Sequence, residues 1–243
     1  MKAYIIRIEL EQSQPLIWRK VIMPAGATYR RLHDVIQNTT NFQSGYPSNG
    51  YHLYAFDLVK ENRIVTDDNV RYLEHQHYKK NKRSYEERLE RMLSDRKRFE
   101  ERRLEQLKIE VRKPTGLKID PYLEKYRELR YNYDFGDDWW FTIKLEEVVD
   151  DYYFGFPTLL DGEGTAPPED VGGIAGFNAF LNVYRQPGHP DYEKTKVWAD
   201  ACFFREYDPE WINGGLKGLD YKKTEWDKIN HINYHAIEDK YRK

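Results

Sequence analysis

The side chains of this 243-residue chain best suited to bind a metal ion are two groups of acidic residues and one histidine. One acidic group belongs to a short turn between two predicted strands, and the other belongs to a loop rich in glycine and proline. The residues concerned are His52, Asp134, Asp137, Asp138, Glu163, Glu169 and Asp170. Carboxylate oxygens on loops suit Mg²⁺ or Ca²⁺, and with the imidazole they could form a metal-dependent hydrolytic site. This cluster is therefore a candidate site for a divalent-cation cofactor.

The same acidic residues also have a purely structural interpretation. Asp and Gly in turns satisfy local backbone groups, and residues 167–170 could cap the helix that follows them. Next to the turn, Trp139 and Trp140 are consecutive in a predicted strand and therefore point to opposite faces. One of them must lie outward, where a neighbouring helix, a ligand or a nucleic-acid base could cover it.

Basic residues are concentrated in one segment of the chain. Residues 79–113 contain 14 Lys and Arg and 8 Asp and Glu, so this segment carries a net charge of +6 in a chain of net charge −2. Such asymmetry indicates contact with an anionic partner, either nucleic acid or an acidic protein. The residues we expect to make this contact are Lys80, Lys82, Arg83, Arg96, Lys97, Arg98, Arg102 and Arg103. The alternative is a solvated helix with i,i+4 ion pairs such as Glu87–Arg91.

Hydrophobic periodicity predicts the elements that position these residues. Strands are expected at 3–11, 16–23, 51–59, 129–135 and 139–148, the last two forming a β-hairpin. Helices are expected at 29–38, with Thr28 as N-cap, at 176–185 and at 191–202, and Asp208 opens a helical turn. The fold class is α+β: a mixed or antiparallel sheet roll with a β-grasp-like start, a central β-hairpin and packed helices.

A long charged helix interrupts this pattern. It is expected to start at Ser84 and to run to about residue 109, roughly 40 Å at 1.5 Å per residue. Its residues Tyr85, Leu89, Met92 and Phe99 fit a heptad seam, which allows a weak coiled coil and a helix-mediated dimer. The predicted organisation is one α+β domain of residues 1–78 and 114–221, a helical insertion at 79–113 and a C-terminal docking helix at 222–243.

Composition restricts the compartment. The chain has one cysteine, Cys202, so it forms no internal disulfide, which favours a reducing environment. The first residues carry Arg7 and Glu9 within their apolar run and do not resemble a signal peptide. No stretch reaches the ~20 apolar residues of a membrane span. We expect a cytoplasmic protein without membrane contact.

Five stretches resemble one known family, which is named after the third open reading frame of an Ri plasmid. They are PLIWRKV at 15–21, LHDVIQ at 32–37, HLYAF at 52–56, YDFGDDW at 133–139 and GEGTAPPEDVGG at 162–173. The resemblance implies an α+β fold and an association with mobile elements, since some members are described as insertion-element passengers. It implies no reaction mechanism.

Two departures limit what the resemblance carries over. Some family members are labelled resolvases, but Arg7 is followed by Ile8 and Glu9 instead of a serine nucleophile, and no His-x-x-Arg pair occurs. Members often have His two positions after the hairpin Trp, where this chain has Phe141.

The sequence leaves two functional hypotheses. In the first, the protein is a non-catalytic binding module that contacts nucleic acid or a protein partner through its basic helix and an aromatic surface. In the second, it is a metal-dependent hydrolase or nuclease centred on His52 and four carboxylates, those of Asp134, Asp137, Glu169 and Asp170. The second hypothesis requires the hairpin turn and the Gly/Pro loop to meet.

Overall fold

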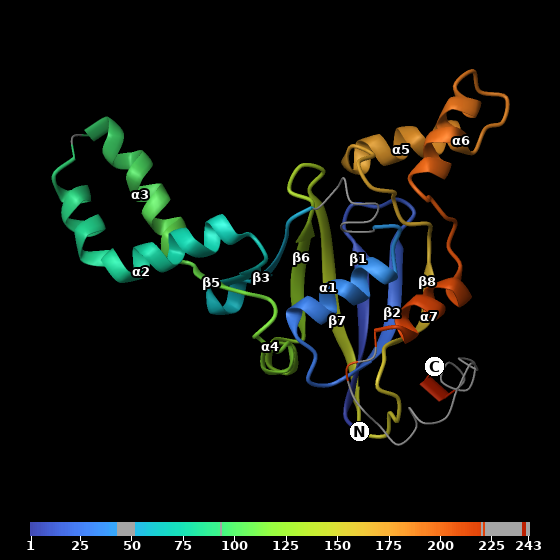
Figure 1. The fold of residues 1–243 in the computed structure, drawn as a ribbon, viewed down its shortest axis with the longest axis horizontal. Coiled ribbons are helices and arrows are strands. Elements are labelled where there is room, and N and C mark those ends of the chain that lie inside the picture. Colours follow the sequence, from blue (N-terminus) through green and yellow to red (C-terminus); the bar gives the residue numbers. More distant parts are fainter. Residues whose placement is uncertain (43–51, 93, 220, 222–239, 242–243) are drawn as a thin grey trace.

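An open, mixed β-sheet forms the centre of the molecule (Figure 1). The computed structural model describes residues 1–42, 52–92, 94–219, 221 and 240–241, without the side chains of 94–96. The strands in this part of the chain are β1 (Ala3–Leu10), β2 (Ile17–Pro24), β3 (Tyr54–Leu58), β4 (Arg63–Thr66), β5 (Glu110–Arg112), β6 (Glu128–Tyr133), β7 (Trp139–Val149) and β8 (Thr158–Glu163). Their order in the sheet is β5-β4-β3-β6-β7-β1-β2-β8. Neighbouring strands run antiparallel, except that β4 and β5 are parallel.

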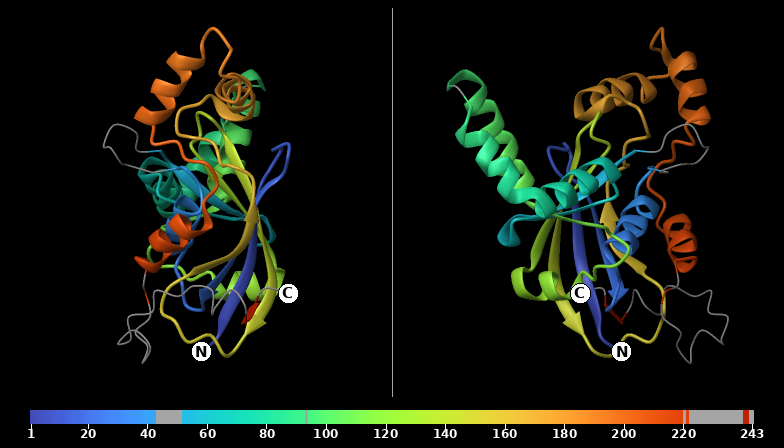
Figure 2. Two further views of the ribbon diagram at one scale, coloured as in Figure 1. Left: turned by 90° about the vertical axis from the view of Figure 1, so that its right-hand side faces the viewer. Right: turned by 60° about the vertical axis from the view of Figure 1, so that its left-hand side comes forward.

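The helices divide into those that cover the sheet and those that project from it. Within the described residues they are α1 (Tyr29–Asn38), the short 3-10 helix η1 (Val59–Glu61), α2 (Asn69–Glu90), α3 (Ser94–Lys108), α4 (Asp120–Tyr126), α5 (Gly173–Tyr184), α6 (Tyr192–Ala201) and α7 (Pro209–Lys217). Helices α1 and α7 lie on the same face of the sheet, whereas α2–α3 and α5–α6 extend beyond it on different sides (Figure 2). The predicted α+β fold is confirmed.

The core lies between α1 and one face of the sheet. Helix α1 starts where predicted, because the Thr28 side chain accepts a hydrogen bond of 3.2 Å from the Arg31 amide. Its Leu32, Val35 and Ile36 are buried against the β1 face that the alternating pattern identified. Burial of such apolar side chains is the main stabilising contribution to the fold.

The start of the chain differs from a β-grasp in one respect. The β1–β2 hairpin and α1 are present, but β3 pairs with β4 and β6. Strand β1 is instead flanked by β2 and β7. The later β6–β7 hairpin therefore separates β3 from the first hairpin. This is a long-range pairing that local periodicity does not encode.

The expectation of one uninterrupted charged helix from Ser84 was wrong. Helix α2 begins at Asn69, capped by Asp68, and ends at Glu90, after which the chain turns and returns as α3. Tyr78, Leu104 and Leu107 are buried together, with Tyr85 and Leu89 packed against them. Tyr85 and Leu89, which were predicted to contact a partner helix, therefore pack within an antiparallel hairpin of the same chain. The prediction of a helix-mediated dimer is not tested by this arrangement.

The ends of the predicted domains fall partly outside the described residues. Of the expected docking helix at 222–243, only Lys240 and Tyr241 are described. The Tyr241 hydroxyl donates to the backbone carbonyl of Asp151 at 3.2 Å, and Lys240 forms an ion pair with the Asp151 carboxylate at 2.8 Å. None of the helices in the described part of the chain combines the length and apolar character required to cross a membrane.

Candidate functional site

The turn between β6 and β7 holds its first carboxylate in a constrained backbone. Asp134 and Asp138 have φ values of 51° and 56°, in the left-handed region that non-glycine residues seldom adopt. The Asp134 carboxylate accepts a hydrogen bond of 3.0 Å from the Gly136 amide, and its residue is 7% exposed. The predicted hairpin thus fixes Asp134 at its tip with the carboxylate turned into the protein.

The Gly/Pro loop reaches this tip. The Gly172 amide donates to the Asp137 carboxylate at 2.9 Å. A Cβ on Gly173, which has a φ of 66°, would lie only 2.8 Å from the Asp137 carbonyl oxygen. Only glycine permits so close an approach at this backbone angle. The turn and the loop therefore meet, as the hydrolase hypothesis required.

His52 lies between the two segments. Its Nδ1 is 3.3 Å from an Asp134 carboxylate oxygen, and its Nε2 is 3.4 Å from an Asp170 carboxylate oxygen. Taking one atom from each of the three residues, all ligand atoms lie within 4.8 Å of one another. The Nε2 atom is enclosed and has no hydrogen-bond partner in the described part of the protein.

A third carboxylate borders this group. One oxygen of Glu169 accepts a hydrogen bond of 2.7 Å from the Tyr133 hydroxyl, and the other is 3.9 Å from His52 Nε2. The Tyr133 ring also packs edge-on against the His52 ring, with centroids 5.9 Å apart. The strand β6 residue Tyr133 thus orients both neighbours. The sequence reasoning missed it, although it opens the YDFGDDW stretch.

The remaining predicted acidic residues contact other groups. The Asp138 carboxylate accepts hydrogen bonds from the Asn132 side chain at 2.9 Å and from the Trp140 indole at 2.8 Å. Glu163 is exposed at the end of β8, and its backbone carbonyl accepts from Arg19. Together with Asp137, which binds the Gly172 amide, these residues hold turns and strand ends in place.

The two tryptophans lie on opposite faces, as expected. Trp139 is 1% exposed and packs against Phe42 in the core. On the other face, the Arg130 guanidinium lies 4.1 Å from the centroid of the Trp140 ring, and this guanidinium is also bound to the Glu11 carboxylate at 2.7 and 2.9 Å. The cover over the outward tryptophan is therefore an arginine, where a neighbouring helix had been the first expectation.

The structure divides the basic residues of α2 and α3 into two sets. Ion pairs join Lys82 to Glu86, Arg83 to Glu87, Arg88 to Glu100 and Arg103 to Glu74. The expected pair Glu87–Arg91 is replaced by Arg83–Glu87. The second set takes part in no ion pair among the described side chains and includes Lys80, Lys97, Arg98 and Arg102. The Arg96 side chain is not among the side chains that the structure describes.

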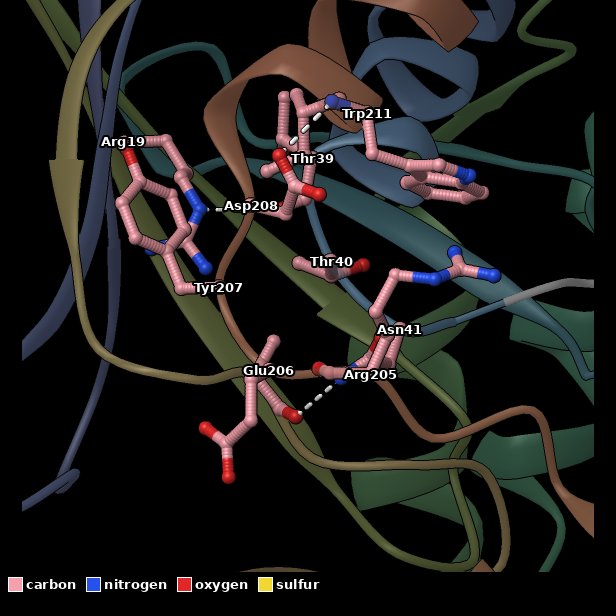
Figure 3. Close-up of a pocket in the computed structure, with 11 residues that line it drawn as sticks. Arg19, Thr39, Thr40, Asn41, Arg205, Glu206, Tyr207, Asp208 and Trp211 are labelled. Carbon is pink, nitrogen blue, oxygen red and sulfur yellow. Dashed lines mark hydrogen bonds between the residues drawn. The ribbon is translucent and has the colours of Figure 1, made fainter. Parts of the chain in front are cut away.

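Arg19 is a buried cation that sequence reasoning did not identify. It is 3% exposed, and its guanidinium donates to the backbone carbonyls of Trp18, Thr39, Glu163 and Gly164 at 2.7 to 2.9 Å. Figure 3 shows it stacked on the Tyr207 ring, 4.3 Å from the centroid. Burial lowers the pKa of Arg19 to about 10, so it stays charged at neutral pH. The adjoining cavity of about 10 Å³ has room for roughly one water molecule, so we assign Arg19 a structural role.

Comparisons with known proteins agree with this architecture. The family described as plasmid pRiA4b ORF-3-like protein matches residues 2–215. The uncharacterized protein y4hQ of Sinorhizobium fredii is 27% identical over 230 residues, which cover 93% of this chain and 96% of that protein. The crystal structure of the protein of unknown function MM3350 from Methanosarcina mazei Go1 is similar, with a TM-score of 0.59 and 24% identity. That match covers 86% of this chain and 96% of the other, and it supports the fold alone.

Proposed function

Because this chain belongs to the plasmid pRiA4b ORF-3-like family and three of its family-like stretches meet at one point, we propose that this point is a metal centre. In this proposal the protein is a metal-dependent hydrolase, and His52, Asp134 and Asp170 bind a divalent cation. The three ligands come from the HLYAF, YDFGDDW and GEGTAPPEDVGG stretches, which are far apart in the sequence.

The observation that carries the proposal is the convergence of ligand atoms within 4.8 Å. Ligand atoms that share one ion at roughly 2.0–2.6 Å lie within about 5 Å of each other, so small side-chain movements suffice for coordination. The enclosed Nε2 of His52 supports the same conclusion, because a ring nitrogen beside carboxylates is a suitable metal ligand.

The ligand set favours particular metals. One imidazole nitrogen together with carboxylate oxygens suits Zn²⁺ or Mn²⁺, whereas Ca²⁺ and Mg²⁺ prefer oxygen ligands throughout. The expectation of Mg²⁺ or Ca²⁺ from the acidic residues alone is therefore revised by the position of His52 within the cluster.

The cluster also contains a group suited to proton transfer. A divalent cation supplies Lewis acidity and lowers the pKa of a bound water. Three protein ligands would leave room at the ion for a water or a substrate. Glu169, held by Tyr133, lies beside the ligands, where its carboxylate is placed to accept a proton from an attacking water.

The first prediction tests cation binding through stability. The melting temperature of chelator-treated protein should rise with Zn²⁺ or Mn²⁺ and rise less with Mg²⁺ or Ca²⁺, because binding to the folded state alone adds about 2.7 kcal/mol at 100 times the Kd. His52→Gln and Asp170→Asn should each remove this rise. His189→Gln is a matched control, since His189 is a second histidine near a carboxylate, 4.0 Å from Asp191.

A second arm of the experiment separates binding from chemistry. Hydrolysis of p-nitrophenyl esters and phosphodiesters should require the stabilising metal and disappear in Asp134→Asn. Glu169→Gln should retain the metal-dependent rise in melting temperature while losing hydrolysis. If no divalent cation shifts the melting temperature, the cluster is an ion-pair clamp and the proposal is wrong.

A second function is favoured by the charges on α2 and α3. Residues 69–108 contain 13 Lys and Arg and 8 Asp and Glu, a net charge of +5. The ion pairs occupy most of the acidic residues and leave exposed cations such as Lys80, Arg98 and Arg102. We therefore propose that the α2–α3 hairpin binds a polyanion, which corresponds to the binding-module hypothesis.

A further inference from the structure

We infer that α3 binds single-stranded nucleic acid, with a base stacked on Phe99 and phosphates held by Arg98 and Arg102. The inference rests on the proposed polyanion binding by α2–α3 and names the chemistry of the partner. The three residues, which we call the α3 patch, lie within one turn and a half of the helix.

Phe99 takes no part in the packing of the hairpin. It is 70% exposed, whereas Tyr78, Leu104 and Leu107 are buried between the two helices. Its position lies just before Glu100, which faces α2 and pairs with Arg88 at 3.7 Å. The hairpin is closed without Phe99, so the ring is available to a partner.

The two arginines near Phe99 are also not used in ion pairs within the described part of the fold. Arg102 lies three residues after Phe99 and four residues after Arg98, so its side chain is a neighbour of both on the helix surface. Both arginines are exposed, and neither takes part in the ion pairs of the described side chains. Two like charges at i,i+4 destabilise a helix. Local choices that oppose folding in this way tend to occur at functional sites.

The combination selects one class of partner. Arginine binds phosphate with two parallel hydrogen bonds, and an aromatic ring stacks on a base of any sequence. Duplex bases present no free face to the ring, and an acidic peptide would use the arginines but gain little from Phe99. An unpaired strand uses all three residues of the α3 patch.

Fluorescence anisotropy with labelled oligothymidine and oligouridine tests the α3 patch. The full-length chain is measured in chelator at about 50 and 200 mM salt, with duplex DNA and anionic vesicles as comparisons. We expect single strands to bind more tightly than duplex. Arg98→Gln with Arg102→Gln should reduce the dependence of log K on log salt by about 1.4, since each phosphate contact on a single strand contributes about 0.7. Phe99→Ala and Phe99→Leu should each weaken binding roughly tenfold or more.

The controls separate this patch from net charge and from the metal centre. Lys82→Gln with Arg83→Gln removes the same charge from ion-paired positions of the same hairpin, and should weaken binding less than the α3 double variant. His52→Gln should bind oligonucleotides like the unchanged protein. Equal losses in both double variants, or an unaltered affinity in Phe99→Leu, would overturn the α3 patch while leaving polyanion binding intact. Absence of all oligonucleotide binding would overturn both, and tighter binding to vesicles would assign the patch to a membrane surface.

Discussion

Arg19 and His52 are both enclosed polar side chains, yet their surroundings differ. The guanidinium of Arg19 is surrounded by backbone carbonyls that accept its hydrogen bonds. His52 is surrounded by carboxylates, and its Nε2 has no hydrogen-bond partner in the described part of the chain. Buried polar groups are normally satisfied, and those that are not call for an explanation. This contrast is the reason for assigning Arg19 to the architecture and His52 to ligand binding.

Replacement of Arg19 should be costly. Arg19→Met leaves four carbonyls without their donor, so we expect the free energy of unfolding to fall by about 3 kcal/mol or more in urea denaturation. Arg19→Lys should lower the free energy of unfolding by less than Arg19→Met does, because the ammonium keeps some of these hydrogen bonds but cannot reach all four carbonyls. Lys20→Met is the control: its partly exposed ion pair with Glu146 at 3.0 Å should contribute less than about 1 kcal/mol. Equal losses in both methionine variants would contradict the role given to Arg19.

His33 should make stability depend on pH. Its ring is 1% exposed, stacks on Tyr54 and has its Nδ1 2.7 Å from the Tyr131 hydroxyl. Burial, with a smaller effect of Arg30, lowers the pKa of His33 to about 3 from the ordinary 6.5. The unfolded chain then binds a proton that the folded chain does not, so stability is present above pH 6.5 and is lost as the pH falls from there toward 3.

The measurement for His33 compares two pH values. Between pH 7.5 and pH 5 this single group should remove about 2 kcal/mol of unfolding free energy. His33→Asn, whose amide can occupy the position of Nδ1, should therefore lose about that much less stability over the same interval, although it starts less stable. His189→Asn should follow the unchanged protein. A slope in His33→Asn equal to that of the unchanged protein would show that another group is responsible.

At the scale of elements, the α2–α3 hairpin is self-contained beyond its base. Its apolar contacts join the two helices to each other through Tyr78, Leu104 and Leu107, with Tyr85 and Leu89 at the margin. Helices in proteins gain most of their stability from packing, so the return of α3 along α2 stabilises both. The sequence showed the helical character of the segment, but the turn after Glu90 contains neither glycine nor proline and gave no signal.

Shortening this hairpin should leave the sheet intact. If residues 83–101 are replaced by a short Gly-Ser turn, the contacts of Tyr78 with Leu104 and Leu107 remain. We expect the unfolding free energy of the core to change by less than about 1 kcal/mol, because no described residue of the replaced segment belongs to the buried clusters of the sheet. Urea denaturation followed by tryptophan fluorescence reports on the core, since all six tryptophans lie outside the replaced segment. A loss of several kcal/mol would show that the distal half supports the sheet.

At the scale of the whole molecule, the sequence predicted local elements well and their assembly poorly. Strands β1, β2, β6 and β7 and helix α1 follow from alternation, turn residues and the Thr28 cap. Strands β4 and β5 are too short for periodicity to reveal, and the placement of β3 beside β6 depends on contacts across about a third of the chain.

The candidate site shows the same division. Motif chemistry singled out His52, Asp134 and Asp170, but only the folded chain brings them within reach of one ion. The sequence could not distinguish Asp134 and Asp170 from Asp138 and Glu163, which are also acidic residues in the same turn and loop. The buried Asp134 and the exposed Asp170 come within reach of His52 because the turn and the loop meet at the contact between Asp137 and Gly172.

The parallel pairing of β4 with β5 has a consequence for how the chain can vary. Parallel neighbours cannot be joined by a tight turn. The polypeptide must therefore leave the sheet after the first strand and re-enter it at the end where that strand began. The α2–α3 hairpin is that connection, and the β4–β5 pairing fixes only the two strands that flank it. A segment inserted between β4 and β5 therefore lies outside the core. The hairpin can therefore be replaced by a reporter or by a different recognition module, while the sheet and the His52 cluster keep their structure.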